Sequence, residues 1–286
     1  MKIKEALALA TSLLKSNQNA GASDALLLMM QVTSLSKERV VFGGDVVLND
    51  DQINNFFHLI KRRASGEPIS HLLQRREFYG SQFLVTKDVL DPRSDSEVLI
   101  EAVFDKFSDK NATIKILELG SGSGCLVITL LKYYPNAVAT TVDLSLEALN
   151  ICQKNAQDHE VLSRLTLLNS DMFDEIDRGS TFDLIISNPP YIRSGDIESL
   201  QSEVKLYEPR MALDGGEDGL KFYRIIAQQA RNHVISGASV VVEIGYDQAE
   251  DVSKIFCDVG YDIVEIRKDL GGNDRVVVLI KNRECF

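Results

Sequence analysis

Four consecutive residues, Asn188-Pro189-Pro190-Tyr191, follow an apolar stretch over 182–187 that is typical of a buried β-strand. The two prolines have a fixed φ and no N–H, so the loop is stiff, but Pro189 keeps its carbonyl acceptor. The Asn188 side-chain oxygen and the Pro189 carbonyl can each accept one N–H of a planar –NH2 group, and the ring of Tyr191 can stack on its plane. The alternative is a proline turn that only closes the strand, with Tyr191 covering it.

A second stretch, Gly120-Ser121-Gly122-Ser123-Gly124, follows another strand-like segment, 114–119. Alternate glycines remove side chains where the backbone turns sharply and where a ligand approaches the main chain. The sequence predicts a helix directly afterwards, and the free N–H groups of its first turn would point at the loop. The spacing is G-x-G-x-G with no lysine following, so it is neither a dinucleotide fingerprint nor a P-loop.

Asp143 ends the next predicted strand, 138–143. A carboxylate in this position can accept hydrogen bonds from both hydroxyls of a ribose. A glycine turn alone could be purely structural. A strand before it, a helix after it and an acid at the end of the next strand together predict a ligand that contains a nucleoside.

The elements that must position these residues differ along the chain. Residues 1–73 have apolar residues at helical spacing, and we expect helices that begin near Ser23 or Asp24, at Ser36, and at Asp50 or Asp51. The β-prone stretch over 74–90 predicts a hairpin that links two domains. The boundaries expected are therefore a helical domain at 1–73, a hairpin linker at 74–90 and an α/β domain at 91–286.

From residue 113 on, strand and helix patterns alternate, which predicts a mostly parallel sheet with helices on both faces. The last two strands should pair antiparallel, because the loop 267–274 is too short for a helix. The predicted fold class is thus α/β, with a seven-stranded Rossmann-like sheet and a small N-terminal helical domain joined by a β-hairpin. Strands are expected near 114–119, 138–143, 165–169, 182–187, 239–244, 261–266 and 275–281, and helices near 96–107, 124–133, 145–157, 218–235 and 247–258.

The net charge of −11 is unevenly distributed. Residues 1–90 carry 11 Lys/Arg and 9 Asp/Glu, so nearly all of the negative charge lies in the rest of the chain. An acidic body disfavours broad phosphate binding. The cluster Lys61-Arg62-Arg63, with Arg75-Arg76, is the one candidate nucleic-acid contact, and a solvated helix face explains it better.

Composition also bears on compartment and metals. No apolar run approaches the ~20 residues that span a bilayer, and the first residues are typical of an amphipathic helix and not of a signal peptide. The four cysteines are too widely spaced for a zinc or redox motif, so we expect no metal site, and they fit a reducing cytoplasm. These are Cys125, Cys152, Cys257 and Cys285.

The glycine loop, Asp143 and the Asn188–Tyr191 loop together resemble the class I methyltransferases that act on planar nitrogens. More of the chain resembles the protein-(glutamine-N5) methyltransferases of peptide chain release factors, the HemK/PrmC family, and the resemblance includes the helical domain. In the family's interdomain stretch, Asp91 replaces an isoleucine and Ser94 a proline. The segments that carry this resemblance are Glu67-Pro68-Ile69, Arg76-Glu77-Phe78, Leu90–Glu97, Glu208–Gly216 and Glu243-Ile244-Gly245.

The resemblance implies S-adenosylmethionine as cofactor and release factors as protein substrates, in the cytoplasm, with neither a membrane nor a stable nucleic-acid partner. It implies that Gly120–Gly124 hold the methionine part of the cofactor, that Asp143 binds the ribose, and that Asp171 and Met172 line the adenine. It further implies that Asn188–Tyr191 bind the glutamine of a Gly-Gly-Gln motif. Asn188, Pro189 and Tyr191 would then act in catalysis, with Asn188 also close to the cofactor.

Two alternatives remain. An adenine-N6 or cytosine-N4 methyltransferase of nucleic acids would need a base-flipping pocket and a basic track, which the acidic body disfavours. A non-catalytic binding module could keep the cofactor fold, but the intact Asn188–Tyr191 loop disfavours it. No general base is assigned; Asp183 and Glu203 are expected to be structural or solvated, and the Tyr191 hydroxyl is expected to be dispensable.

Overall fold

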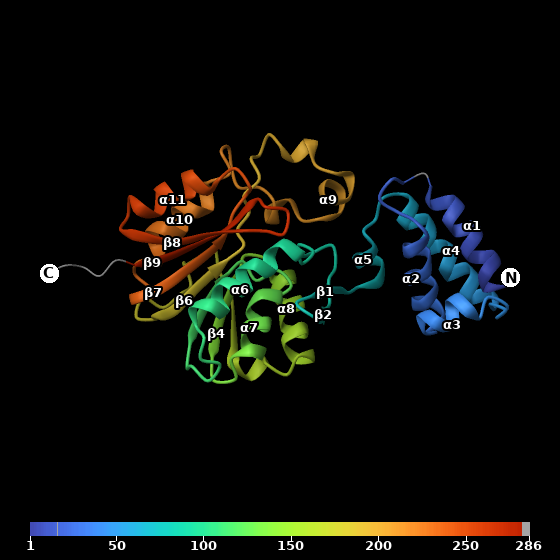
Figure 1. The fold of residues 1–286 in the computed structure, drawn as a ribbon, viewed down its shortest axis with the longest axis horizontal. Coiled ribbons are helices and arrows are strands. Elements are labelled where there is room, and N and C mark those ends of the chain that lie inside the picture. The colour runs from blue at the N-terminus through green and yellow to red at the C-terminus, as the bar shows by residue number, and fades with distance from the viewer. Residues whose placement is uncertain (16, 282–286) are drawn as a thin grey trace. The chain divides into compact units, whose positions relative to one another are not determined.

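The computed structural model describes residues 1–15 and 17–281, which divide into two compact units (Figure 1). The first unit comprises Met1–Arg75 together with Gln201–Tyr207. The second comprises Arg76–Leu200 and the described chain from Glu208 on. The sequence placed residues 201–207 in the α/β domain. They belong to the helical unit because Glu203 pairs with Arg63 there.

Six helices form the helical unit as described: α1 (Ile3–Leu14), α2 (Ala22–Thr33), α3 (Lys37–Phe42), α4 (Asp50–Ala64), α5 (Ile69–Leu73) and α9 (Ser202–Tyr207). The apolar stripes of α1, α2 and α4 meet in one core, as their spacing predicted. Fully buried residues of this core include Ile3, Leu14, Leu28, Phe56 and Ile60.

Two of the predicted helix starts are confirmed. Ser36 is the N-cap of α3 and accepts from the Arg39 N–H, and α4 starts at Asp50 behind an Asn49 capping box. The predicted cap of α2 is wrong, because Gly21 precedes the helix and Asp24 is buried inside it.

The interpretation of the basic cluster as a solvated helix face is wrong for Arg63. Its guanidinium is only 3% exposed and donates from Nε to Asp24 and from Nη1 to Glu203, at 2.7 Å each. It also donates to the main-chain carbonyls of Asn19 and Glu67. A charge this deeply buried needs such partners, so the Arg63 side chain is not exposed for contact with a nucleic acid.

The second unit contains a hairpin, β1 (Arg76–Phe78) and β2 (Ser81–Phe83), and a seven-stranded sheet of order β5-β4-β3-β6-β7-β9-β8. The pairs from β5 to β7 are parallel, and β9 runs antiparallel to both β7 and β8. The predicted fold class is therefore confirmed. The strands are β3 (Lys115–Leu119), β4 (Val138–Asp143), β5 (Leu165–Asn169), β6 (Phe182–Ser187), β7 (Val234–Glu243), β8 (Tyr261–Lys268) and β9 (Asp274–Lys281).

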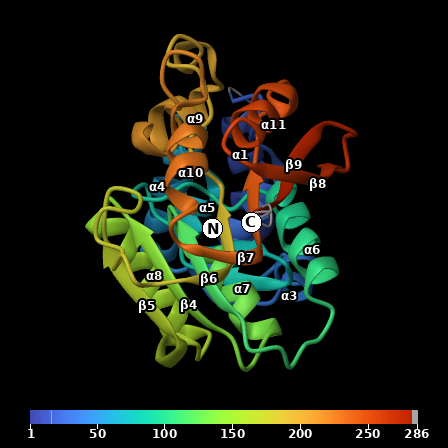
Figure 2. The ribbon, with the colours of Figure 1, turned by 90° about the vertical axis from the view of Figure 1, so that its left-hand side faces the viewer.

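Alternation along the strands directs apolar residues into two cores. Ile116 of β3 lies in the core beneath α6 (Glu97–Lys106), α7 (Cys125–Tyr133) and α8 (Leu146–Asp158). Leu117, its neighbour, lies in the core beneath α10 (Lys221–Ala230) and α11 (Ala249–Cys257), on the opposite face (Figure 2). Short 3-10 turns occur at Ser94–Ser96, Leu162–Arg164, Ile197–Ser199 and Arg210–Ala212.

The helix expected over 218–235 is too long. It ends at Ala230, and β7 begins at Val234 because this residue pairs with Phe182 of β6. Sheet pairing thus overrides a local pattern that continued the helix.

None of the described helices is long and apolar enough to cross a membrane. Among the residues that the structure describes, no group of three or more His, Cys, Asp or Glu could hold a metal ion. Cys125, Cys152 and Cys257 are free thiols, and Cys285 lies outside the described residues.

Candidate active site

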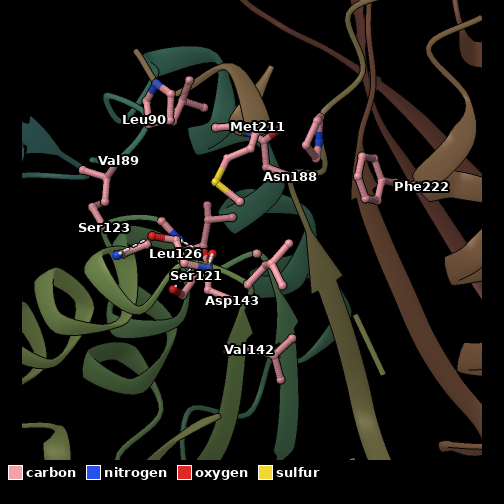
Figure 3. A pocket seen from close by; sticks show the side chains of 18 of the residues that line it. Val89, Leu90, Ser121, Ser123, Leu126, Val142, Asp143, Asn188, Met211 and Phe222 are labelled. Carbon is pink, nitrogen blue, oxygen red and sulfur yellow. Dashed lines mark hydrogen bonds between the residues drawn. The ribbon is translucent and has the colours of Figure 1, made fainter. Parts of the chain in front are cut away.

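A cavity of about 490 Å³ lies at the carboxyl ends of β3, β4 and β6, within the range of small-molecule sites. In Figure 3, Ser121 and Asp143 lie together, and Asn188 and Met211 lie above them. Several stretches of the second unit that are far apart in sequence therefore meet in one pocket. The predicted residues in its wall are Gly120, Ser121, Gly122, Ser123, Asp143, Asp171, Met172, Asn188 and Pro190.

The three glycines of the loop have different roles. Gly120 and Gly122 have φ of +81° and +49°, and a Cβ on either would meet no described atom within 4 Å. They give the backbone its left-handed turns and leave the pocket open. Gly124 is not part of the wall: it starts α7, and a Cβ there would lie 2.6 Å from the Cys152 sulfur. Its absence of a side chain allows α7 and α8 to pack closely.

Asp143 closes the glycine loop and also faces the pocket. Its Oδ2 accepts from the Gly122 N–H at 3.0 Å and from the Ser121 hydroxyl at 3.2 Å, and its Oδ1 accepts from the Ser145 N–H at 2.9 Å. A carboxylate has about four lone-pair sites. One acceptor site therefore remains, and exchange of the Ser121 hydroxyl would free a second for a ligand with paired hydroxyls.

Asp171 and Met172 follow β5 and lie in the same wall. Met172 has a left-handed backbone with φ of +51°, which is rare for a residue with a side chain. The Ser170 hydroxyl holds this turn by donating to the Met172 carbonyl and accepting from the Glu175 N–H. Strain of this kind persists only where its surroundings enforce it, and here it presents an apolar side chain beside an acid.

The structure separates the residues of the Asn188–Tyr191 loop. Asn188 and Pro190 line the pocket, whereas Pro189 is buried and is not among the lining residues, so a role of its carbonyl in substrate binding stays a prediction. Tyr191 is half-buried against the core beneath α10, and its hydroxyl donates to Glu243 Oε1 at 3.3 Å. Tyr191 is not among the residues that line the pocket, so the stacking of its ring on a substrate stays a prediction.

Comparison with known proteins identifies the family. The chain matches the family descriptions PrmC N-terminal domain over residues 5–73 and Methyltransferase small domain over residues 85–207. A release factor glutamine methyltransferase from Agrobacterium fabrum is 39% identical over 267 residues, which are 91% of this chain and 92% of that protein. The chain belongs to the release factor glutamine methyltransferase family. The resemblance seen in the sequence is confirmed, and the chain is a methyltransferase.

Two further similarities bear on domain content and fold. A bifunctional methyltransferase from Rickettsia conorii is 36% identical over 89% of this chain, but the chain spans only 53% of that protein. A solved methyltransferase from Pyrococcus furiosus superposes with a TM-score of 0.53 at 16% identity, covering 78% of this chain and 98% of that one. At this identity the second similarity shows the fold alone.

Several residues of the methyltransferase pocket were not predicted as site residues. A signal was present for two of them, because Leu90 and Met211 lie in segments that carried the family resemblance. These segments meet where Arg93 Nη2 contacts both carboxylate oxygens of Glu208, at 2.5 and 2.6 Å. Burial raises the pKa of Glu208, and Arg93 acts in the opposite direction. The unpredicted wall residues include Val89, Leu90, Leu126, Met211 and Phe222.

Glu118, in β3 of the methyltransferase, gives a pH-dependent prediction. It accepts from the Val127 N–H and the Thr141 hydroxyl, and burial raises its pKa to about 8. Between its unfolded value of about 4.3 and the folded value, the unfolded chain releases a proton that the folded chain keeps, so stability should fall as pH rises. Glu118→Gln removes this titrating group, so the fall in the free energy of unfolding with pH should become shallower by up to about 1.4 kcal/mol per pH unit.

Urea unfolding at about pH 5, 6 and 7 measures this slope for Glu118→Gln. Some slope should remain, because burial also raises the pKa of Glu243, to about 7. The exposed Glu147, replaced in the same way, is the control and should leave the slope unchanged. Equal slopes for Glu118→Gln and the parent protein would mean that Glu118 is ionised in the folded state.

Proposed function

We propose that this methyltransferase transfers a methyl group from S-adenosylmethionine to the side-chain amide nitrogen of the glutamine in the Gly-Gly-Gln motif of peptide chain release factors. The observation that carries the proposal is that Asn188 shares one pocket with the glycine loop and Asp143. A planar amide held by Asn188 would thus face a cofactor held by the loop. Release factors act on ribosomes, so this substrate also implies the cytoplasm.

The residues of the pocket fit S-adenosylmethionine. Asp143 offers acceptor capacity for ribose hydroxyls, and Gly120 and Gly122 leave space for the methionine part beside the main chain. Asp171 and Met172 offer an acceptor and an apolar surface for adenine. When bound, this cofactor supplies a methyl group on a positively charged sulfur, a strong electrophile.

The residues of the chain then have to orient a poor nucleophile, since the lone pair of an amide nitrogen is delocalised into its carbonyl. Asn188 Oδ1 accepts one N–H of the substrate amide, and the Pro189 carbonyl is the proposed acceptor for the other. Both acceptors stabilise the positive charge that develops on nitrogen more strongly than the neutral ground state. An N-methylated cationic amide is acidic enough to release its proton to water, so the mechanism requires no general base.

The helical unit is proposed to dock the protein substrate. In support, residues 1–75 and 201–207 of this unit carry 10 Lys/Arg and 8 Asp/Glu, whereas the rest of the chain is strongly acidic. A docking surface of opposite charge balance to the catalytic unit would orient a partner on encounter.

The direct test incubates the protein with radiolabelled S-adenosylmethionine in two separate reactions, one with a release factor and one with a DNA duplex. We expect label in the release factor only, and none when its Gly-Gly-Gln glutamine is replaced by alanine. Label in DNA but not in protein would instead favour an amino methyltransferase of nucleic acids.

Asp143→Ala tests the cofactor site. The substitution removes charge-assisted hydrogen bonds to the ribose, each contributing about 1.5–3 kcal/mol, so calorimetry should show at least a tenfold weaker affinity for S-adenosylmethionine. Asp158→Ala removes an equal charge from an exposed position of α8 and should bind normally. Unchanged affinity of Asp143→Ala would exclude Asp143 from the site.

A further inference from the structure

Glu243 is a fully buried acid at the end of β7, for which the mechanism above has no role. It is 1% exposed and follows the buried residues Val240–Val242. The parallel register aligns Val242 with Ser187 of β6, so Glu243 lies level with Asn188, the first residue of the catalytic loop. Burying a carboxylate is costly unless hydrogen bonds compensate, and its contacts therefore indicate what it stabilises.

The contacts of Glu243 reach both ends of the catalytic loop. Its Oε1 accepts from the Tyr191 hydroxyl at 3.3 Å. Its Oε2 is buried and has no hydrogen-bond partner among the described atoms, and an interaction with the Ser96 hydroxyl lowers the pKa of the carboxyl group against the effect of burial. Ser96 Oγ in turn accepts from Asn188 Nδ2 at 3.2 Å. One carboxylate thus accepts a hydrogen bond from Tyr191 and interacts electrostatically with the hydroxyl that Asn188 contacts.

Ser96 lies where the 3-10 turn Ser94–Ser96 runs directly into α6. Its φ of −70° and ψ of −13° are helical, so its hydroxyl has no capping role at this position. The hydroxyl instead accepts from Asn188 Nδ2, and Ser96 lines the pocket. Its interaction with the Glu243 carboxylate places it between these two side chains.

The segment after Glu243 also holds the loop. Gln248 donates from Nε2 to the Tyr191 carbonyl at 3.0 Å and accepts from the Gly245 N–H at 2.9 Å. A Cβ on Gly245 would lie 2.9 Å from the Gln248 oxygen, so glycine makes room for this contact. Arg275 donates to the Ile244 carbonyl at 3.2 Å and places a positive charge near Glu243. Glu243 therefore has a fixed backbone and a partial counter-charge.

We propose that Glu243 is a positioning residue for methyl transfer: through Ser96 and Tyr191 it fixes the catalytic loop and orients the Asn188 side chain. With Nδ2 bonded to Ser96, the Asn188 oxygen points the other way and is the atom that meets the substrate –NH2. Without this connection the Asn188 amide can rotate by 180° and present its –NH2 group to the substrate –NH2. Both groups are donors, so no hydrogen bond forms between them. The inference rests on the proposed role of Asn188.

The test compares Ser96→Ala with Ser96→Thr, and Glu243→Ala with Glu243→Gln. Ser96→Ala should lower kcat about tenfold and Glu243→Ala at least as much, corresponding to about 1.4 kcal/mol per factor of ten. Ser96→Thr and Glu243→Gln keep a hydroxyl and an acceptor, so they should recover most of the activity. Affinity for S-adenosylmethionine should stay within threefold of the parent. Glu265→Ala, at an exposed position of β8, is the control and should be unchanged.

A double-mutant cycle separates positioning from independent effects. Because Ser96 acts together with Glu243, the double variant should be no slower than Glu243→Ala alone. Fold losses that multiply, parent-like kcat in Glu243→Ala, or a loss confined to cofactor affinity would each overturn the proposal. Should Glu243→Ala not fold, the comparison of Ser96→Ala with Ser96→Thr decides: equal kcat in these two variants overturns it.

A measurement without substrate distinguishes this proposal from the proposed function. The side-chain amide resonances of Asn188, identified by their loss in Asn188→Asp, should shift in Ser96→Ala and Glu243→Ala and stay in place in Glu265→Ala. Such shifts support the positioning role even if release factor is not methylated by the parent protein. Unshifted resonances overturn it even if release factor is methylated.

Discussion

Replacing Asn188 by alanine should lower kcat for release factor by about 10²–10³-fold, with little change in the affinity for S-adenosylmethionine. The magnitude follows by analogy from the loss of one preorganised donor in an oxyanion hole, with the sign of the charge reversed. The loss should appear in kcat because the nitrogen becomes positive only as the transition state is approached. Steady-state kinetics and calorimetry on the same preparation measure the two quantities.

The matched variant is Asn188→Asp, which keeps an acceptor at the same place. It adds a charge that is costly to desolvate beside the substrate, and it has no Nδ2 group to donate to Ser96. Partial recovery at most is expected. An Asn188→Ala enzyme that keeps more than about a third of the parent kcat would show that the amide is oriented by other groups.

The second large effect concerns stability. Arg63→Met should lower the free energy of unfolding by about 3–5 kcal/mol, the usual effect of breaking a buried ion pair from one side. The substitution leaves the carboxylates of Asp24 and Glu203 without the guanidinium, and these are 13% and 22% exposed. Urea denaturation, followed by far-UV circular dichroism, measures the change.

The neighbouring arginine provides the control. Arg62 pairs with Glu67 but is 42% exposed, so Arg62→Met should cost about 1 kcal/mol or less. Adding Asp24→Asn to Arg63→Met removes one stranded charge and should restore part of the stability. If Arg62→Met and Arg63→Met were equally destabilised, the burial of Arg63 would have no energetic role.

The sheet could be predicted from sequence because its signals are local and consistent. Apolar strands that end at Asp143 or directly before Gly120 and Asn188 alternate with amphipathic helices, and parallel pairing follows from that alternation. The predictions of helix ends and caps were wrong where contacts between residues far apart in sequence determine the structure. Val234 leaves the helical pattern to pair with Phe182, and Asp24 lies inside α2 because Arg63 reaches it.

Only part of the candidate site could be predicted from the sequence. Glycine loops and proline turns act through their own backbone, so Gly122 and Asn188 could be recognised without neighbours. The Tyr191 hydroxyl was expected to be dispensable because stacking on a substrate needs only the ring. Its contact with Glu243, 52 residues further along the chain, depends on the fold and has no local signal. Ser96 was not predicted as a site residue either, because its contact with Asn188 joins residues 92 apart in sequence.

The assignment of Gln201–Tyr207 to the helical unit has a consequence for how the protein can be divided. The chain passes from one unit to the other three times, after Arg75, Leu200 and Tyr207. No single cut therefore yields two whole parts: a catalytic fragment that begins at Arg76 carries a helix whose partners, Arg63 and Ser65, it has lost. An exchange of the helical unit between relatives would therefore have to include both segments, Met1–Arg75 and Gln201–Tyr207, so that Arg63 and Glu203 come from the same protein.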